Sequence, residues 1–201
     1  MWAQDRFGEA FERFSEALRL DPKNFRAHNN VGHALASRGH IDEGIRHYRA
    51  ALALNPDFAD AHVNLGRALA SQGRFEDAVR HQREARRAAP NWVVPMADLA
   101  WLLATAPDER LRQPDEAVRL AEQAAELTGR QNIAALDALA ASYAAVRRFE
   151  EAVAAADAAL ALAVAAGVPR VADELRARLE RYRNREPFVD RRGVSPQEGS
   201  Q

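Results

Sequence analysis

Apolar and polar positions alternate along most of the chain with the spacing of amphipathic helices. Between residues 59 and 72 a stripe of small and apolar residues recurs at three- and four-residue steps, which places them on one helix face: Ala61, His62, Leu65, Ala68 and Leu69. Gly73 marks the end of that helix, and residues 75–88 form the next one. Pro90 stops it, because proline cannot continue the helical hydrogen-bond ladder. The pattern predicts a pair of helices joined by a tight turn.

This helix pair is a repeat of the one before it. Residues 25–58 and 59–92 align without gaps, and Gly66 follows Gly32 by 34 residues. The same shift pairs further positions: Ala27 with Ala61, Asn30 with Asn64, Gly39 with Gly73, Ala51 with Ala85 and Pro56 with Pro90. Two complete helix–turn–helix units of this length are typical of a solenoid.

The same register extends in both directions. We expect these segments: 1–24, the second half of a truncated repeat; 25–58 and 59–92, full repeats; 93–128, a repeat with an inserted loop at 105–113; 133–166, a further repeat; 169–185, a polar capping helix; and 186–201, a disordered tail. The low aromatic share, 7%, and the many alanines predict a core of closely approaching helices.

The repeated positions resemble those of the tetratricopeptide repeat family. The resemblance rests on Leu65–Gly66, Ala78, Ala85 and Pro90 and on their counterparts Val31–Gly32, Gly44, Ala51 and Pro56. The sequence departs from the family where His28 and His62 replace the usual Trp and Gly44 replaces the usual Ala. The resemblance implies an all-α fold, a right-handed α-solenoid of helix–turn–helix repeats with a C-terminal capping helix.

The resemblance also implies a concave face that is lined by the first helix of each repeat. The residues that this assigns to a peptide-binding groove are Arg26, Asn29, Asn30, His33, Asn64, Arg67, Asp98 and Trp101. In family members that bind a chaperone's C-terminal carboxylate, basic residues and asparagines form a clamp. In this sequence many of the clamp positions are occupied by Asn29, His33, Asp60 and Val63, which disfavours such a clamp.

Asn30 and Asn64 are the sharpest candidates in this groove. An amide side chain offers donors and acceptors, so asparagines repeated along a groove can bind the main chain of an extended peptide. The alternative is that they recur only because the unit was duplicated. Asp98 and Ala138 take the next two places, so the row ends early.

Trp101 is a second candidate, because a rigid aromatic ring in a groove is a typical binding anchor. The alternative, which we favour, is that Trp101 packs as core under the inserted loop 105–113. The groove positions around Trp101 are small and apolar, whereas those in the earlier repeats are polar. This contrast suggests a ligand with one polar or acidic end and one apolar end.

Charge and composition exclude several function classes. The 28 basic and 29 acidic residues nearly cancel, so the sequence lacks the basic field of a nucleic-acid binder. The arginines at 176–185 lie among acids, so we expect them to form a solvated face, and RNA binding through them is a minor alternative. Cysteine is absent, which excludes disulfides and thiol chemistry. The histidines form repeat-equivalent pairs without metal-ligand spacing, so we expect no metal. The sequence has no glycine-rich phosphate loop and no nucleophile elbow, so we expect no cofactor and no enzyme activity.

The expected function is therefore a non-catalytic scaffold that binds a protein or peptide segment. No apolar run is long enough for membrane insertion, and we expect a cytoplasmic location. Residues 99–112, 115–129 and 135–153 resemble the last segment of long bacterial repeat proteins, some of which carry such arrays beside glycosyltransferase-type membrane regions. The alternative is therefore a C-terminal substrate-presenting or regulatory segment of a larger enzyme such as a glycosyltransferase, which the truncated first repeat also favours. Uncovered Phe7, Phe11 and Phe14 also suggest self-association through the truncated first repeat.

Overall fold

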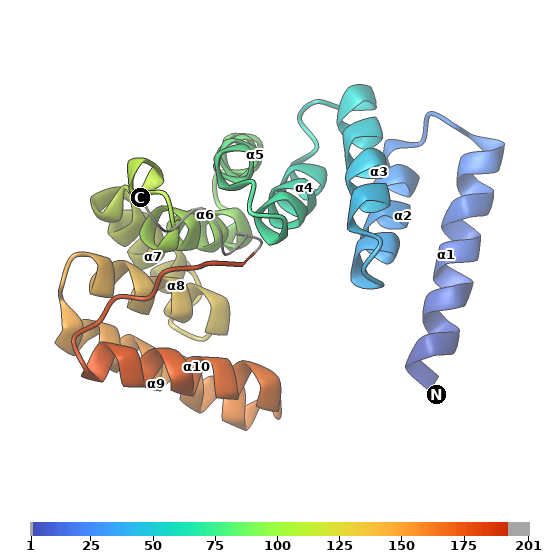
Figure 1. The fold of residues 1–201 in the computed structure, drawn as a ribbon. Coiled ribbons are helices and arrows are strands. Elements are labelled where there is room, and N and C mark those ends of the chain that lie inside the picture. The colour runs from blue at the N-terminus through green and yellow to red at the C-terminus, as the bar shows by residue number, and fades with distance from the viewer. Residues whose placement is uncertain (1, 193–201) are drawn as a thin grey trace, which may run out of the picture. The chain divides into compact units, whose positions relative to one another are not determined.

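Helices make up all of the regular structure in the described part of the chain (Figure 1). The computed structural model describes the backbone of residues 2–192 and the side chains of residues 11–192. The elements are α1 (Trp2–Leu20), α2 (Phe25–Ser37), α3 (Ile41–Leu54), α4 (Ala59–Ser71), α5 (Phe75–Ala88), α6 (Val93–Thr105), the short 3₁₀ helix η1 (Glu109–Leu111), α7 (Pro114–Leu127), α8 (Ile133–Ala145), α9 (Phe149–Ala165) and α10 (Pro169–Arg183). The expected all-α fold of successive helix hairpins is confirmed.

The chain divides after Pro90 into two compact units. In the first unit each helix from α1 to α5 packs on the next, and the two first helices α2 and α4 also meet. Phe11 and Phe14 of α1 are half-buried, whereas Phe7 lies outside the residues whose side chains are described. In the second unit α6 packs on both α7 and α8, and α8, α9 and α10 follow in turn.

The turns inside the hairpins depend on a left-handed residue. Gly39 ends the first hairpin's leading helix with φ at 88°, and Gly73 does the same in the next with φ at 77°. Both conformations are open to glycine and strained for other residues. Arg147 holds the equivalent place after α8 with φ at 63°, so this turn forms in spite of a side chain.

Helix backbones approach closely inside the first unit. A Cβ atom added to Gly44 would lie 2.9 Å from the carbonyl oxygen of Gly32, so both positions must remain bare for α2 and α3 to touch. Ala51, Ala78 and Ala85 have no exposed surface. The core is therefore made of small residues at short helix–helix distances, as the composition predicts.

The end of the chain differs from the expectation of a disordered tail. Residues 186–192 leave α10 and turn back to α6, where the backbone N–H of Asp190 donates to the carbonyl oxygen of Thr105 at 2.7 Å (Figure 1). The rest of the expected tail, 193–201, lies outside the described residues. We call residues 186–192 the tail strap.

Candidate functional site

In the first unit, the asparagines of α2 and α4 form one hydrogen-bonded chain. The Nδ2 atom of Asn64 donates to Oδ1 of Asn29 at 3.0 Å, and Nδ2 of Asn29 approaches Oδ1 of Asn30 at 3.4 Å. Asn29 is buried, whereas Asn30 and Asn64 are half-buried. The two candidate asparagines therefore lie on adjoining helices, and Asn29, expected to line the groove, instead connects them.

Charged and aromatic groups flank this chain of amides. His33 and Arg67 are exposed on α2 and α4. The guanidinium carbon of Arg26 lies 5.4 Å from the ring centroid of Phe25 and 5.8 Å from that of Phe58. The sequence-predicted residues of the first unit thus gather on its first helices. Their role in binding stays a prediction.

Two histidine pairs lie between the helices of the first unit's hairpins. Nδ1 of His62 lies 2.9 Å from Nδ1 of His81, and the equivalent atoms of His28 and His47 lie 3.2 Å apart. The Nε2 atoms of His62 and His28 each face a proline carbonyl oxygen, at 2.9 and 3.1 Å. Burial, helped by the neighbouring His62, lowers the pKa of His81 to about 4. The pairs act as partly buried polar contacts between helices, and within the described residues no three potential metal ligands cluster.

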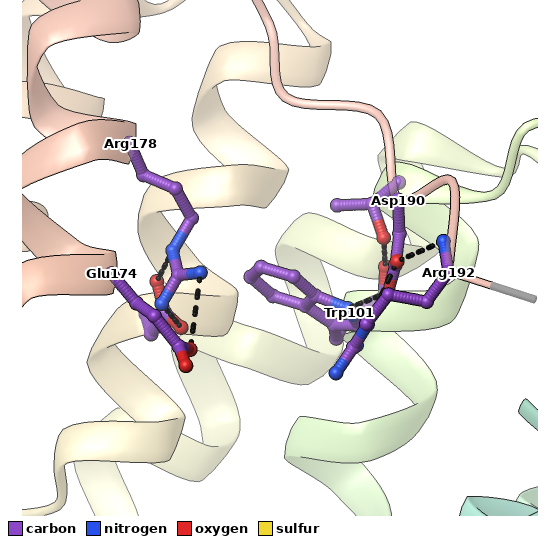
Figure 2. A network of polar contacts seen from close by, with 7 residues as sticks. Trp101, Glu174, Arg178, Asp190 and Arg192 are labelled. Atoms are coloured by element: carbon purple, nitrogen blue, oxygen red, sulfur yellow. Dashed lines mark hydrogen bonds and ion pairs between the residues drawn. The ribbon is translucent and has the colours of Figure 1, made fainter. Parts of the chain in front are cut away.

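The second unit places Trp101 against the tail strap (Figure 2). The indole Nε1–H donates to Oδ2 of Asp190 at 3.2 Å, and the ring centroid lies 5.5 Å from that of Phe188. Our preferred interpretation of Trp101, as core beneath residues 105–113, does not describe these contacts. Asp98, one helical turn before Trp101 on α6, is half-buried.

Arg178 of α10 holds the other side of this cluster. Its Nε and one terminal nitrogen donate to the two carboxylate oxygens of Asp137 on α8, both at 3.0 Å. Its guanidinium carbon also lies 5.2 Å from the ring centroid of Trp101 (Figure 2). The same carbon lies 5.7 Å from the ring centroid of Phe188. Burial raises the pKa of Asp137 to about 6, against the opposing influence of Arg178. The arginine therefore joins α8, α6 and the tail strap.

Asp190 of the tail strap is a buried acid, with 2% of its surface exposed. Burial opposes its ionisation, but hydrogen bonds from Arg192 and Trp101 outweigh that effect and leave the pKa of this carboxyl below its usual value. The Nε atom of Arg192 donates to Asp190 at 2.9 Å. A charged, fully partnered carboxylate is thus held against α6.

The sequence did not reveal Arg178 or Asp190 as site residues. The arginines at 176–185 were expected to form a solvated face, yet Arg178 is 9% exposed. All five of these arginines have a carboxylate partner: Arg176 with Asp173, Arg178 with Asp137, Arg181 with Glu186, Arg183 with Glu180, and Arg185 with Glu150. One signal pointed to Arg178, because it shares a helix face with Leu175, Leu179 and Tyr182, which are buried.

The sequence and the fold both match those of known repeat proteins. The sequence model of the tetratricopeptide repeat family matches residues 2–43 and 32–91, which together cover the first unit. This match identifies the repeats of the first unit as tetratricopeptide repeats. No curated protein sequence matches the chain. The described residues include no helix that is both long and apolar enough to cross a membrane.

Solved structures extend the likeness of fold to the second unit. A thermophilic tetratricopeptide repeat protein from Thermus thermophilus is 22% identical, with a TM-score of 0.64 and 92% of each chain covered. YrrB, described as a repeat protein with an unusual peptide-binding site, is 20% identical with a TM-score of 0.63, and 88% of each chain is covered. An O-GlcNAc transferase from Thermobaculum terrenum is 24% identical with a TM-score of 0.53 over 58% of this chain and 22% of that enzyme.

Proposed function

We propose that this protein is a non-catalytic scaffold that binds an extended segment of another protein on the first helices of its first unit. The observation that carries the proposal is the amide chain of Asn64, Asn29 and Asn30. It runs from one repeat to the next on the helices that carry the exposed His33 and Arg67.

The chemistry of this surface suits a main chain more than a particular side chain. An amide group has two donor hydrogens and an acceptor oxygen, and a peptide bond presents one donor and one acceptor. Because Asn29 fixes the amide of Asn64, little side-chain freedom is lost when a ligand binds. His33 and Arg67 beside the row would favour a segment with acidic or polar side chains.

A displayed library of random ten-residue peptides, selected on the full chain, supplies the probe. We expect that Asn64→Ala weakens selected peptides about tenfold, which is the loss of one or two well-placed hydrogen bonds. Arg80→Ala is the matched control, because Arg80 is exposed on α5, a second helix. If selected peptides bind both variants alike, or if no peptide is selected, the proposed groove is wrong.

A second candidate is that the same repeats present substrates within a larger enzyme. The observation that favours it is the fold likeness to the O-GlcNAc transferase, of which this chain covers 22%. The length of the complete reading frame tests it. A frame that encodes a catalytic domain would support the enzyme segment, and one without such a domain would contradict it.

We also propose that α1 mediates self-association. Phe11 and Phe14 on this helix are only half-buried, so they leave apolar surface for a second copy. Sedimentation should then show a concentration-dependent dimer that Phe14→Ser abolishes. A strict monomer at high concentration would contradict this.

A further inference from the structure

The second unit holds an extended piece of polypeptide on the side chains of its own helices. The aromatic side chain of Phe188 lies against the ring of Trp101 on α6 and the guanidinium of Arg178 on α10. Asp137 on α8 fixes that guanidinium through two hydrogen bonds of 3.0 Å. Three helices therefore build one binding site for an aromatic ring, which we call the seat: Trp101 of α6, Asp137 of α8 and Arg178 of α10. Arg178 is only 9% exposed.

The carboxylate of Asp190, two residues after Phe188, binds beside the aromatic ring. The indole Nε1–H of Trp101 donates to Asp190, and the N–H of Asp190 donates to the carbonyl oxygen of Thr105 (Figure 2). One main-chain bond and one side-chain bond thus fix the direction of the strap. A buried carboxylate is costly unless its partners are in place, and here they are the indole N–H of Trp101 and the guanidinium of Arg192 on the strap itself.

We infer that this seat is a binding site for a short extended segment of a partner protein that carries an aromatic residue and, two residues further on, an acidic one. The chain's own Phe188 and Asp190 occupy it in cis and compete with that partner. The inference concerns the second unit alone and does not depend on the groove proposed for the first.

The strap is attached in a way that allows exchange. Glu186 and Pro187, which connect α10 to the seat, are exposed. They are held by Arg181, whose ion pair with Glu186 at 3.3 Å and hydrogen bond to the carbonyl oxygen of Pro187 at 3.2 Å both lie at the surface. Such surface contacts contribute little, so Phe188 and Asp190 carry most of the attachment. When the strap leaves, its charges return to water while the helices keep their own packing.

The test uses a fluorescent peptide with the sequence EPFVDRR, which is residues 186–192. The double variant Phe188→Ala/Asp190→Ala of the full chain vacates the seat without altering α6, α8 or α10. We expect this variant to bind the peptide with one-to-one stoichiometry and at least about tenfold more tightly than the wild type, because an attached strap competes at a millimolar effective concentration.

Matched controls distinguish peptide binding at the seat from nonspecific binding. A peptide with Asn in place of its Asp should bind the double variant about tenfold more weakly, because a neutral amide oxygen accepts a weaker hydrogen bond from the indole N–H of Trp101 than a carboxylate does. Adding Trp101→Leu to the double variant should abolish binding, whereas adding Arg176→Ala should leave it unchanged, since Arg176 pairs with Asp173 at the surface. A folded double variant that binds neither peptide, or both alike, would overturn the inference.

A measurement on the wild type covers the case in which the double variant does not fold. The amide hydrogen of Asp190 is protected by its bond to Thr105. Excess peptide should accelerate its exchange several-fold while helix amides of α8 remain unchanged, because only the strap is displaced. No acceleration at peptide concentrations near the effective concentration of the strap, about 1 mM, would contradict the proposal. Dimerisation of the wild type that the double variant abolishes would assign the seat to a second copy and also overturn it.

Discussion

The Nδ1 atoms of His62 and His81 lie 2.9 Å apart, so one proton is shared between two rings. Nε2 of His62 faces the carbonyl oxygen of Pro56 at 2.9 Å and must carry a hydrogen there. In a neutral His62 the Nδ1 atom is then the acceptor, and His81 donates. The same arrangement joins His28 and His47 in the preceding repeat.

These pairs predict that the first unit loses stability in mild acid. The pKa of His81 is lowered to about 4 by burial and by His62, and the pKa of His47 is also below its usual value. Below pH 6.5 the unfolded chain binds a proton at each site, whereas folded His81 does not until about pH 4. The free energy of unfolding should therefore fall between pH 7 and pH 4.5, by roughly 1 kcal/mol after allowance for solvent screening.

Hydrogen exchange of amides in α4 and α5 measures this loss in the first unit. His81→Gln keeps a donor at this position but cannot titrate, so it should flatten the pH dependence. His33→Gln removes an exposed histidine and should leave the slope unchanged. Equal slopes in all three proteins would show that the pair does not govern acid stability.

Gly44→Ala should destabilise the first unit although alanine favours helices. The new Cβ would meet the carbonyl oxygen of Gly32 at 2.9 Å and Cβ of Ala36 at 3.1 Å, so α2 and α3 would have to separate. Overpacking of this kind costs roughly 1–3 kcal/mol, against a propensity gain of about 1 kcal/mol. Urea unfolding followed by exchange of α2 and α3 amides checks the sign, and a more stable variant would mean that the helices separate freely.

The helices and their pairing could be predicted because they depend on local features. Gly73 and Pro90 end helices through their own backbone chemistry, and the alanine and glycine positions recur at a fixed interval. The contact of Trp101 with Asp190 could not be predicted in this way. It joins residues 89 positions apart, and the strap has no periodic pattern that a repeat search detects.

In the candidate site, too, local features could be predicted from the sequence and contacts between distant residues could not. The sequence placed Asn30 and Asn64 on first helices, and the structure connects them through Asn29. It did not show that Asn29 is buried, because this depends on how closely α2 and α4 approach. Arg178 was assigned to a solvated face because its neighbours in sequence are charged, whereas its partner Asp137 lies 41 residues away.

Arg147→Gly should stabilise the second unit. Arg147 has φ at 63°, where a side chain is strained, and the equivalent Gly39 and Gly73 adopt positive φ freely. Relief of this strain is worth roughly 0.5–1 kcal/mol, reduced slightly by the lost contact of its guanidinium with the Phe149 ring at 5.8 Å. Thermal unfolding measures the gain. Arg148→Gly is the control: its φ is −83°, so glycine relieves nothing there and should destabilise.

Arg178→Ala should destabilise the second unit far more than Arg176→Ala. The side chains of Arg178 and Asp137 are 11% and 16% exposed, so removal of the arginine leaves a buried carboxylate without its principal partner. Breaking such a pair costs roughly 3–5 kcal/mol, whereas the exposed pair of Arg176 with Asp173 contributes less than about 1 kcal/mol. Urea unfolding followed by exchange of α8 and α10 amides measures both.

The double variant Arg178→Met/Asp137→Leu removes the charges together and should regain most of the stability, because no buried charge is left unpaired. It should not restore the seat for Phe188, which needs the guanidinium. Equal losses in Arg178→Ala and Arg176→Ala would mean that the Arg178–Asp137 pair does not hold α10 to α8.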